Sequence, residues 1–376
     1  MKNLTLEEIL EYEQPTKYIV ESEQYKDEYN IPVLTAGKSF ILGYTNEENG
    51  IYNASKTNPI ILFDDFTTNC KYVDFNFKVK SSAAKILKLK GNEANLKYLY
   101  YCLKSIIYDT SSHKRYWISQ YSKFKINLPD LSYQNNIVSK IEKIEELIDI
   151  KEKQINKIKE LIISQFNTMF GYPIDNNRWK QKKLNDVCDV RDGTHDSPKY
   201  YSKGYLFVTS KNLINEEIDF STCNYINKED YDKINKRSKV DDGDILMPMI
   251  GTIGGAIIVK KDREFAIKNV ALIKFKNNDI NNVFLKYLLN SQEMNDYFNS
   301  IKKGGIQKFI SLTTIRNLPI IVPPIELQRD FSCFVQENNK LILICEKELK
   351  KLEELKDSKM QEYFGGVIYE QKWTRN

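Results

Sequence analysis

The acidic pair Asp64-Asp65 is the feature of this sequence that comes nearest to a metal-dependent catalytic site. It follows the apolar run PIILF and precedes Thr67 and Thr68, so it falls where a strand is expected to end. Metal-dependent cleavage needs several carboxylates that converge on one ion. No carboxylate or histidine near the pair has a spacing that completes such a set. The pair is therefore interpreted as a strand-end turn, or as hydrogen-bond acceptors for base amino groups.

A second match to catalytic chemistry is the pattern Pro129-Asp130, then Asp149 and Lys151, which follows the lettering of a nuclease core. The second element lies inside a stretch with helical periodicity, about 28 Å along the helix from Asp130 at 1.5 Å per residue. Carboxylates that far apart do not share a metal ion. The nuclease interpretation is therefore set aside.

Cofactor motifs are missing from the sequence. The glycine-rich stretch at residues 249–259 lacks the GK[ST] of a phosphate loop and the first Gly-x-Gly of a dinucleotide fingerprint, and is more typical of a tight hairpin. No Asn-Pro-Pro-aromatic motif for amino methylation occurs. The six cysteines and two histidines show no ligand spacing for zinc. We therefore expect no catalysis, cofactor or metal on this chain.

Loops that mix basic, amide and aromatic side chains recur at like places in the two halves. Residues 111–123 (SSHKRYWISQYSK) and 302–317 (KKGGIQKFISLTTIRN) each precede a proline and a long helical stretch, and residues 191–204 read RDGTHDSPKYYSKG. This mixture serves phosphate contact and base-edge reading. Each residue alone is more often a solvated surface group, but the recurrence favours contact. The candidate DNA-binding residues are Lys38, Thr67, Lys114, Arg115, Tyr116, Arg191, Thr194, His195, Lys199, Tyr200, Lys211, Gln307 and Lys308.

The elements that would position these loops are duplicated. LPDLSYQ at residues 128–134 and VPPIELQ at residues 322–328 both lead from an apolar run into a helical stretch. At the same separation, identical residues keep recurring without a gap as far as Phe170-Gly171 and Phe364-Gly365. The chain is therefore an internal repeat.

Each repeat predicts one long helix. Apolar residues recur at alternating spacings of four and three, which is typical of a coiled-coil seam. Prolines precede each stretch and glycines follow it, so the helices should cover roughly 38 residues, or about 55 Å. Further apolar residues at Leu147, Ile150 and Leu161, and at Leu341, Ile344 and Leu355, predict that each helix buries a second face. Two ordinary core helices are the alternative, although charged runs cover most of their surface.

The rest of the sequence indicates two globular α+β domains, because short β-branched and aromatic runs alternate there with one or two helical stretches. The length of 376 residues allows two or three domains. We predict globular domains at residues 1–130 and 172–323, long helices at residues 131–171 and 324–366, and a tail at residues 367–376.

Composition is compatible with nucleic acid but does not demand it. The formal net charge is +5, and the segment between residues 172 and 325 is slightly basic, which also describes an ordinary lysine-rich protein. No window approaches about 18 consecutive apolar residues, and the first residues lack a signal-peptide core. We expect a cytoplasmic protein with reduced thiols and no membrane partner.

Taken in order, these segments resemble the specificity subunits of type I restriction-modification systems. The resemblance rests on the paired LPDLSYQ and VPPIELQ entries and on RDGTHDSPKYY, GDILMPMIGTIGG and GGIQKFISLTTIRNLPIIVPP. In the first half it also rests on EYEQPTKYIV, IPVLTAGKSFILGYT, IILFDDFTT, KYVDFNFKVKSSAAKIL and HKRYWISQYSKFKINLP. Each motif is loose, but their order is specific, and it covers all but about the last ten residues.

The resemblance implies two target-recognition domains, each reading half of a bipartite double-stranded DNA site, held apart by the two helices as an antiparallel spacer. It implies docking of two methyltransferase subunits and, for cleavage, restriction subunits. S-adenosylmethionine would then bind the methyltransferase, and ATP and Mg the restriction subunit. A helix of about 55 Å spans roughly 15 base pairs. Because the halves differ outside the helices, the site should be asymmetric.

Packing of the two helices about a pseudo-twofold axis is a specific expectation. The predicted seam pairs Ile141, Ile144, Ile148 and Ile155 with Val335, Ile342, Leu349 and Leu352 running the other way. The second helix has Phe331, Ser332 and Cys333 where the first has Ile137, Val138 and Ser139, so packing there need not be symmetrical, nor need the two docking surfaces be identical. The alternatives are a chain that itself methylates or cuts DNA, and a coiled-coil adaptor without DNA affinity.

Overall fold

The chain forms two compact units. The computed structural model describes residues 2–37, 39–106, 115–174, 176–250, 255–276, 278–301, 309–365 and 368–369. Unit 1 joins residues 1–152 to residues 347–376, and unit 2 comprises residues 153–346. Each unit therefore contains one globular domain and half of each long helix.

The two long helices are α4, Leu131–Phe170, and α10, Ile325–Phe364, each of 40 residues. Asp130 caps the start of α4, because its side chain accepts a hydrogen bond of 2.9 Å from the Tyr133 N–H. Gly171 ends the helix with φ +71°, a conformation that favours glycine. Both helices lie within the ranges expected for them, residues 131–171 and 324–366, and Asp130 is a helix cap rather than a nuclease ligand.

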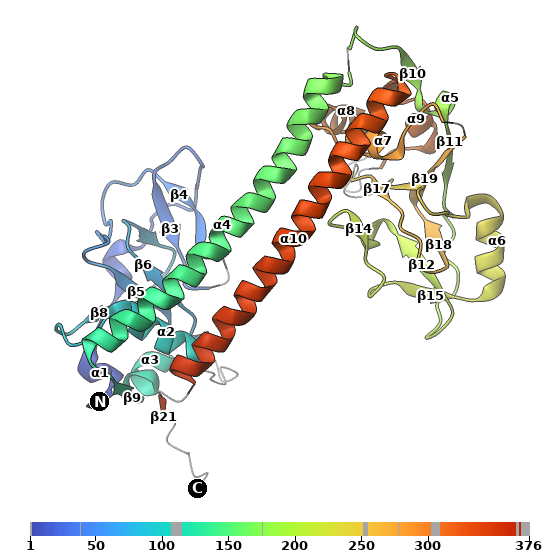
Figure 1. Cartoon of the computed structure of the whole chain (residues 1–376). Coiled ribbons are helices and arrows are strands. Elements are labelled where there is room, and N and C mark those ends of the chain that lie inside the picture. The colour runs from blue at the N-terminus through green and yellow to red at the C-terminus, as the bar shows by residue number, and fades with distance from the viewer. Residues whose placement is uncertain are drawn as a thin grey trace. The chain divides into compact units, whose positions relative to one another are not determined.

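The helices run antiparallel in both units (Figure 1). In unit 1 the first half of α4 meets the last half of α10, where Glu145 pairs with Lys356 at 2.7 Å and Lys151 pairs with Glu348 at 2.7 Å. In unit 2 the end of α4 meets the start of α10, where the Phe166 and Phe331 ring centroids lie 5.3 Å apart. These contacts confirm the predicted antiparallel pairing.

The residues of the predicted seam are buried or half-buried along both helices. Ile141, Ile155, Val335 and Ile342 are buried, and Ile144, Ile148, Leu349 and Leu352 are half-buried. The polar break at Lys151 is used for the ion pair with Glu348, and the break at Asn338 is a buried side chain that donates to the Phe334 carbonyl at 2.9 Å. This burial supports the seam expected from the 4-3 spacing, and the residue pairing across it stays a prediction.

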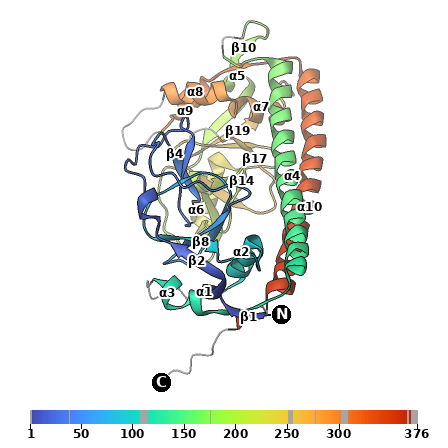
Figure 2. The same ribbon diagram turned by 90° about the vertical axis from the view of Figure 1, so that its left-hand side faces the viewer.

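The expected second buried face of the helices is wrong. Leu147, Ile150, Leu161, Leu341, Ile344 and Leu355 are 43% to 52% exposed. In unit 1, α2 (Leu96–Ser105) covers a different flank of α4, through a Lys97–Glu142 ion pair and a Tyr101–Glu145 hydrogen bond (Figure 2). The extra apolar residues therefore lie at the surface of the chain.

Unit 1 is built from short strands in three sheets, whose orders are β2-β8-β5-β6, β4-β3-β7 and β1-β9-β21. All pairs are antiparallel except β3 with β7. The strands are β1 Lys2–Thr5, β2 Leu10–Glu13, β3 Ile31–Leu34, β4 Ile41–Thr45, β5 Ile60–Asp64, β6 Cys70–Val73, β7 Lys78–Val79, β8 Ala84–Leu89, β9 Lys125–Leu128 and β21 Ile368–Tyr369. The short helices are α1 Leu6–Ile9, η1 Pro15–Tyr18, α3 Tyr116–Ser119 and η2 Tyr121–Lys123.

Unit 2 has matching sheets with the orders β11-β19-β16-β17, β15-β12-β18 and β10-β20, and a small β13-β14 pair. The strands are β10 Gln181–Lys183, β11 Cys188–Asp192, β12 Tyr205–Thr209, β13 Leu213–Ile214, β14 Glu217–Ile218, β15 Asn224–Ile226, β16 Ile245–Pro248, β17 Ile257–Ile258, β18 Phe265–Lys268, β19 Val270–Phe275 and β20 Pro319–Ile321. The helices are α5 Leu184–Val187, η3 Ser210–Asn212, α6 Lys228–Ser238, α7 Asn282–Leu289, α8 Gln292–Ile301 and α9 Leu312–Arg316.

The two globular domains share one topology, so the repeat extends beyond the helices. The four-stranded sheets have the same order of equivalent strands, and β12 pairs in parallel with β18 as β3 does with β7. A difference is β21, which adds a third strand beside β9 through the Ile368 to Ile126 register. Two residues of the predicted tail thus belong to a sheet of unit 1.

A buried glutamine joins each long helix to its globular domain and explains the repeated LPDLSYQ and VPPIELQ entries. Gln134 is fully buried; its amide oxygen accepts from the Asn95 N–H at 2.8 Å, and its amide nitrogen donates to the Pro129 carbonyl at 2.8 Å. Gln328 makes the same bonds to Asn281 at 2.9 Å and to Pro323 at 2.8 Å.

The ends of the helices confirm the expected asymmetry. In unit 2, Phe331 lies among the rings of Phe166, Phe170, Phe284 and Tyr287. In unit 1 the counterpart Ile137 is aliphatic and is also buried. The two ends are therefore filled by different side chains around one backbone plan.

Candidate nucleic-acid interface

In unit 1, the turn after β5 and the start of α3 lie together. Asp64 folds the turn, because its Oδ1 accepts from the Phe66 N–H at 2.8 Å and the Thr67 N–H at 3.0 Å. The Tyr116 N–H donates to the Asp65 carbonyl at 2.8 Å, which holds the exposed Arg115 beside this turn. Exposed Thr67 and Arg115 are thus brought to one surface, and Asp64 has the predicted strand-end role.

The Asp65 carboxylate is buried and engaged within unit 1. Its side chain is 1% exposed and lies 3.3 Å from the equally buried Nζ of Lys85 on β8. Its other carboxylate oxygen accepts from the Trp117 N–H at 2.8 Å. The interpretation of Asp65 as a base-contacting acceptor is therefore corrected to that of a buried ion pair.

Tyr116 is also corrected. It is 2% exposed and packs in the core of unit 1, so the aromatic side chain beside Arg115 serves packing rather than DNA contact. Of the remaining residues expected in the first half, Lys38 and Lys114 lie outside the described residues.

In unit 2, residues 193–194 pack against the turn between β18 and β19. The Gly193 N–H donates to the Val270 carbonyl at 3.0 Å, and the Thr194 N–H donates to the Ile267 carbonyl at 3.0 Å. A Cβ on Gly193 would lie 2.2 Å from the Ile267 carbonyl oxygen. Position 193 thus requires glycine, because any side chain would displace the loop from the turn.

His195 is the centre of a polar network on this surface. The histidine side chain is 62% exposed; its Nε2 lies 2.9 Å from Asp192 Oδ2 and its Nδ1 lies 2.8 Å from Asn269 Oδ1. Arg237 donates to the other Asp192 oxygen at 2.8 Å. The network engages both ring nitrogens and fixes the exposed imidazole at the surface of unit 2.

Lysines surround this network. Ser210, at the start of η3, donates to the Asn269 carbonyl at 2.6 Å, which places the exposed Lys211 next to the β18–β19 turn. Lys268 donates to Ser197 in the loop that also carries Lys199. Tyr200 is 45% exposed beside Lys199. The predicted Thr194, His195, Lys199, Tyr200 and Lys211 therefore all come from one group of loops.

Lys268 and Asn269 belong to this surface but were not among the predicted residues. The signal for them is a Lys-Asn dipeptide between the apolar runs FAI and VALI, which is typical of a tight turn. Asn269 has φ +52°, a conformation that asparagine tolerates better than most residues.

Arg191 has a structural role that sequence reasoning missed. Its guanidinium donates to Asp189 at 2.9 and 2.5 Å and to the Arg237 carbonyl at 3.0 Å. The hydrogen bond from Arg191 lowers the pKa of the Asp189 carboxyl. Because its donors are engaged within unit 2, the expected base contact is corrected to a contact that holds β11 to the end of α6.

The region before α9 is only partly described. Gln307 and Lys308 lie outside the described residues, and Phe309 is 46% exposed and bridges to Ile250.

The strands on either side of the glycine-rich stretch, β16 and β17, pair antiparallel in the register Leu246 to Ile257, as expected for a hairpin. Gly255 in this stretch has φ +67°.

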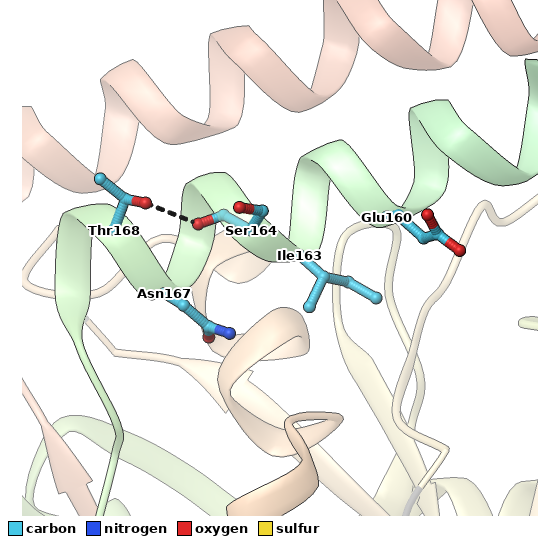
Figure 3. A pocket seen from close by; sticks show the side chains of 5 residues that line it. All are labelled: Glu160, Ile163, Ser164, Asn167 and Thr168. Carbon is cyan, nitrogen blue, oxygen red and sulfur yellow. Dashed lines mark hydrogen bonds between the residues drawn. The ribbon is translucent and has the colours of Figure 1, made fainter.

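Glu160, Ile163, Ser164, Asn167 and Thr168 line a shallow hollow on α4. The hollow on α4 in Figure 3 is lined by residues of one helix, with Thr168 donating to the Ser164 carbonyl at 2.9 Å. Among the described residues, no three His, Cys, Asp or Glu side chains gather to hold a metal ion. Within the same residues, no helix is long and apolar enough to cross a membrane.

Comparison with known proteins gives consistent matches. The family model "Type I restriction modification DNA specificity domain" matches residues 1–160 and 176–354. The chain is 47% identical over 178 residues to the Escherichia coli type I restriction enzyme EcoR124I/EcoR124II specificity subunit, covering 43% of this chain and 44% of that protein. It is 25% identical over 268 residues to the Methanocaldococcus jannaschii MjaVIII specificity subunit, covering 66% of this chain and 63% of the relative. The chain thus spans about half to just under two thirds of the length of these relatives.

Solved structures show the same fold at low identity. The type I restriction-modification S subunit from M. genitalium matches with a TM-score of 0.56 and 16% identity, over 98% of this chain and 96% of that one. A chain from a study of complex assembly and conformational transition in a type I system matches with a TM-score of 0.58 and 16% identity, over 97% and 98%. Because the family model matches both repeats, this chain belongs to the family of type I restriction-modification DNA specificity domains.

Proposed function

We propose that this chain is the DNA specificity subunit of a type I restriction-modification complex. Each globular domain reads one half of a bipartite, asymmetric double-stranded DNA site, and the paired helices set the distance between the halves. The observation that carries the proposal is the repeat: two domains of one topology, each joined by a buried glutamine to one of two antiparallel helices.

The chain itself performs no catalysis in this proposal. S-adenosylmethionine belongs to the methyltransferase partner, and ATP and Mg belong to a restriction partner. Incubating the purified, partner-free chain with S-adenosylmethionine and DNA tests this point. Methyl transfer by the isolated chain would favour the rival function of a self-sufficient methyltransferase.

Two methyltransferase subunits dock on the long helices. The support is the set of exposed apolar residues at equivalent positions of the repeat, Leu147 with Leu341, Ile150 with Ile344 and Leu161 with Leu355. Exposed apolar residues on a pair of helices are typical of a protein contact. Because the same residue types occupy both helices, the two docking surfaces should resemble each other despite the unlike helix ends at Phe331 and Ile137.

The test is the methylated motif found in cells that carry this chain with its methyltransferase. We expect two unlike short half-sites separated by an unread gap. Purified complex should bind such DNA with an affinity that falls as salt rises, because phosphate contacts release counterions. Salt-independent or undetectable binding would instead favour a structural adaptor.

A paired insertion tests the spacer. One heptad added to both helices keeps the seam facing inward and lengthens the pair by about 10 Å, or about three base pairs. Both half-sites should then stay the same while the gap widens. The same heptad in one helix only is the control, and it should damage folding. An unchanged gap in a folded, active paired variant would show that another element measures the distance.

A further inference from the structure

A buried ion pair in unit 1 lies directly beneath the start of α3. Asp65 and Lys85 are each 1% exposed, and Asp65 Oδ2 lies 3.3 Å from Lys85 Nζ. Within the part of the chain that the structure describes, neither of these two atoms has a hydrogen-bond partner. Burial of two charges carries a large desolvation penalty, and apolar replacement of such pairs is often neutral or stabilising. The pair therefore calls for a role other than stability.

Unit 2 shows that the fold does not require this pair. The registers of β5 with β8 and of β16 with β19 align Asp65 with Met249 and Lys85 with Ala271. Met249 is 4% exposed and Ala271 is fully buried, so an apolar pair fills the equivalent position. The same topology is thus built with and without the charges.

The backbone connection at this position is the same in both units. The Tyr116 N–H donates to the Asp65 carbonyl at 2.8 Å, and the Ile310 N–H donates to the Met249 carbonyl at 2.9 Å. What differs is the side-chain chemistry beneath the connection. The extra contact in unit 1 therefore shows what the charges add.

The Asp65 side chain holds the first turn of α3. Its Oδ1 accepts from the Trp117 N–H at 2.8 Å, while Arg115, the residue at the cap position, gives no side-chain cap. In unit 2, by contrast, Ser311 caps α9 with its own hydroxyl, which accepts from the Thr314 N–H at 3.1 Å. In unit 1 the short helix α3 is thus held by Asp65, which follows β5, rather than by the side chain of its own cap residue.

We propose that the buried Asp65–Lys85 pair positions Arg115 for reading the first half-site. Lys85 orients the Asp65 carboxylate, the carboxylate fixes the backbone at Trp117, and the exposed Arg115 lies next to that backbone. Bidentate recognition of a base by arginine needs close positional control, so loss of the anchor should relax base choice. The inference rests on the proposed function, with Arg115 as a base-contacting residue.

The test uses two paired variants in the full chain, co-expressed with its methyltransferase. D65M/K85A transplants the pair found in unit 2 and removes both the charges and the Trp117 hydrogen bond. D65N/K85M removes the charges but keeps an acceptor for Trp117. Methylated motifs are mapped, and the purified complexes are titrated with duplexes that carry single base changes in either half-site.

We expect D65M/K85A to fold and to lose about tenfold or more discrimination at one position of one half-site, while the other half-site is unchanged. D65N/K85M should keep more of that discrimination. A double-mutant cycle with R115A should be non-additive, because the pair acts through Arg115. A purely structural role would lower stability without moving base choice.

Three outcomes overturn the inference. If D65M/K85A folds and discriminates between bases as well as the wild type does, the pair does not position Arg115. Failure of both paired variants to fold makes the pair a requirement of the fold. Additive effects with R115A show that the pair does not act through that residue. If the wild-type chain itself yields no bipartite motif, the proposed function fails first, and this result is distinct from the other three.

Discussion

Replacing Gln134 by methionine should detach the start of α4 from its globular domain without changing the packed volume much. The side chain is fully buried and makes three hydrogen bonds: to the Asn95 N–H, to the Pro129 carbonyl at 2.8 Å and to the Glu93 carbonyl at 3.2 Å. Methionine has no donor for the two carbonyls, and its sulfur is only a weak acceptor for the Asn95 N–H. The Asn95 N–H would then lose its partner at the very point where α2 begins.

The expected cost follows from the groups left unpaired. Leaving a buried donor or acceptor unsatisfied costs about 1–3 kcal/mol. Glu93 is exposed, so water can replace the glutamine at its carbonyl, whereas Asn95 and Pro129 are only partly accessible. Counting these two groups at about 1–3 kcal/mol each, Q134M should destabilise unit 1 by about 2–6 kcal/mol. Q328M should act similarly on unit 2, where the bond to Pro323 is buried.

Amide hydrogen exchange locates the effect, because it reports the opening of each unit separately. Q134M should speed exchange in α2 but not in α7, and Q328M should do the reverse. Urea unfolding gives the magnitude. The matched control is N136M, because Asn136 lies on the same helix turn but is exposed. This control should change stability by no more than about 0.5 kcal/mol.

Two results would refute the reasoning. If Q134M behaves like N136M, the hydrogen bonds of Gln134 contribute nothing net, and the repeated glutamine has another cause. If Q134M speeds exchange equally in α2 and α7, the two units open as one and the local argument fails.

Three further predictions concern pH, packing and the loop of unit 2. Burial opposes ionisation of Glu13, but hydrogen bonds, of which the one from Lys88 is the strongest, outweigh burial and lower the pKa of Glu13 to about 2. The ionised Glu13 therefore contributes fully to stability above about pH 4.5, and this contribution is lost as pH falls toward 2. E13Q should flatten this part of an acid-unfolding curve. F331A removes a fully buried ring and should cost about 3–5 kcal/mol in urea unfolding, whereas C333A at an exposed position should be nearly neutral. G193A should displace the loop around His195 and weaken DNA binding by about 1–3 kcal/mol. The control G37A, whose new Cβ would meet its nearest neighbour at 3.4 Å, should leave DNA binding unchanged.

Sequence periodicity was sufficient to predict the two long helices, because one helical pattern continues over about forty residues, far longer than the stretches in which helix and strand patterns are confused. The prolines before α4 and α10 and the glycines after them mark ends that the backbone enforces. Periodicity could not tell which apolar stripe meets a partner within the chain. Leu147 and Ile150 have the same apolar character as the seam residue Ile148, yet they remain exposed.

The loops were harder to predict because composition does not set side-chain direction. Tyr116 and Arg115 are adjacent, but the tyrosine points into the core and the arginine remains exposed. The Asp65–Lys85 pair depends on the register between β5 and β8, which no local pattern encodes. A basic residue such as Arg191 can likewise be engaged by a neighbouring carboxylate.

Under the proposed function, the repeat would bring the two units to DNA through different parts of one scaffold. The hydrogen bond from the Thr194 N–H to the Ile267 carbonyl in unit 2 has a counterpart in unit 1, where the Val20 N–H donates to the Val79 carbonyl at 3.0 Å. Around the latter, Lys80 pairs with Glu23, and buried Lys78 pairs with Glu47 at 2.7 Å.

The lysines at that place in unit 1 are therefore neutralised by carboxylates of the same unit, whereas Lys199 and Lys211 in unit 2 are exposed. A phosphate approaching that place in unit 1 would meet paired charges and gain little, because the lysine attraction is already offset. Among the described residues of unit 1, the proposed function would then draw on the surface formed by the turn after β5 and Arg115, and unlike reading surfaces on matched topologies would give an asymmetric site.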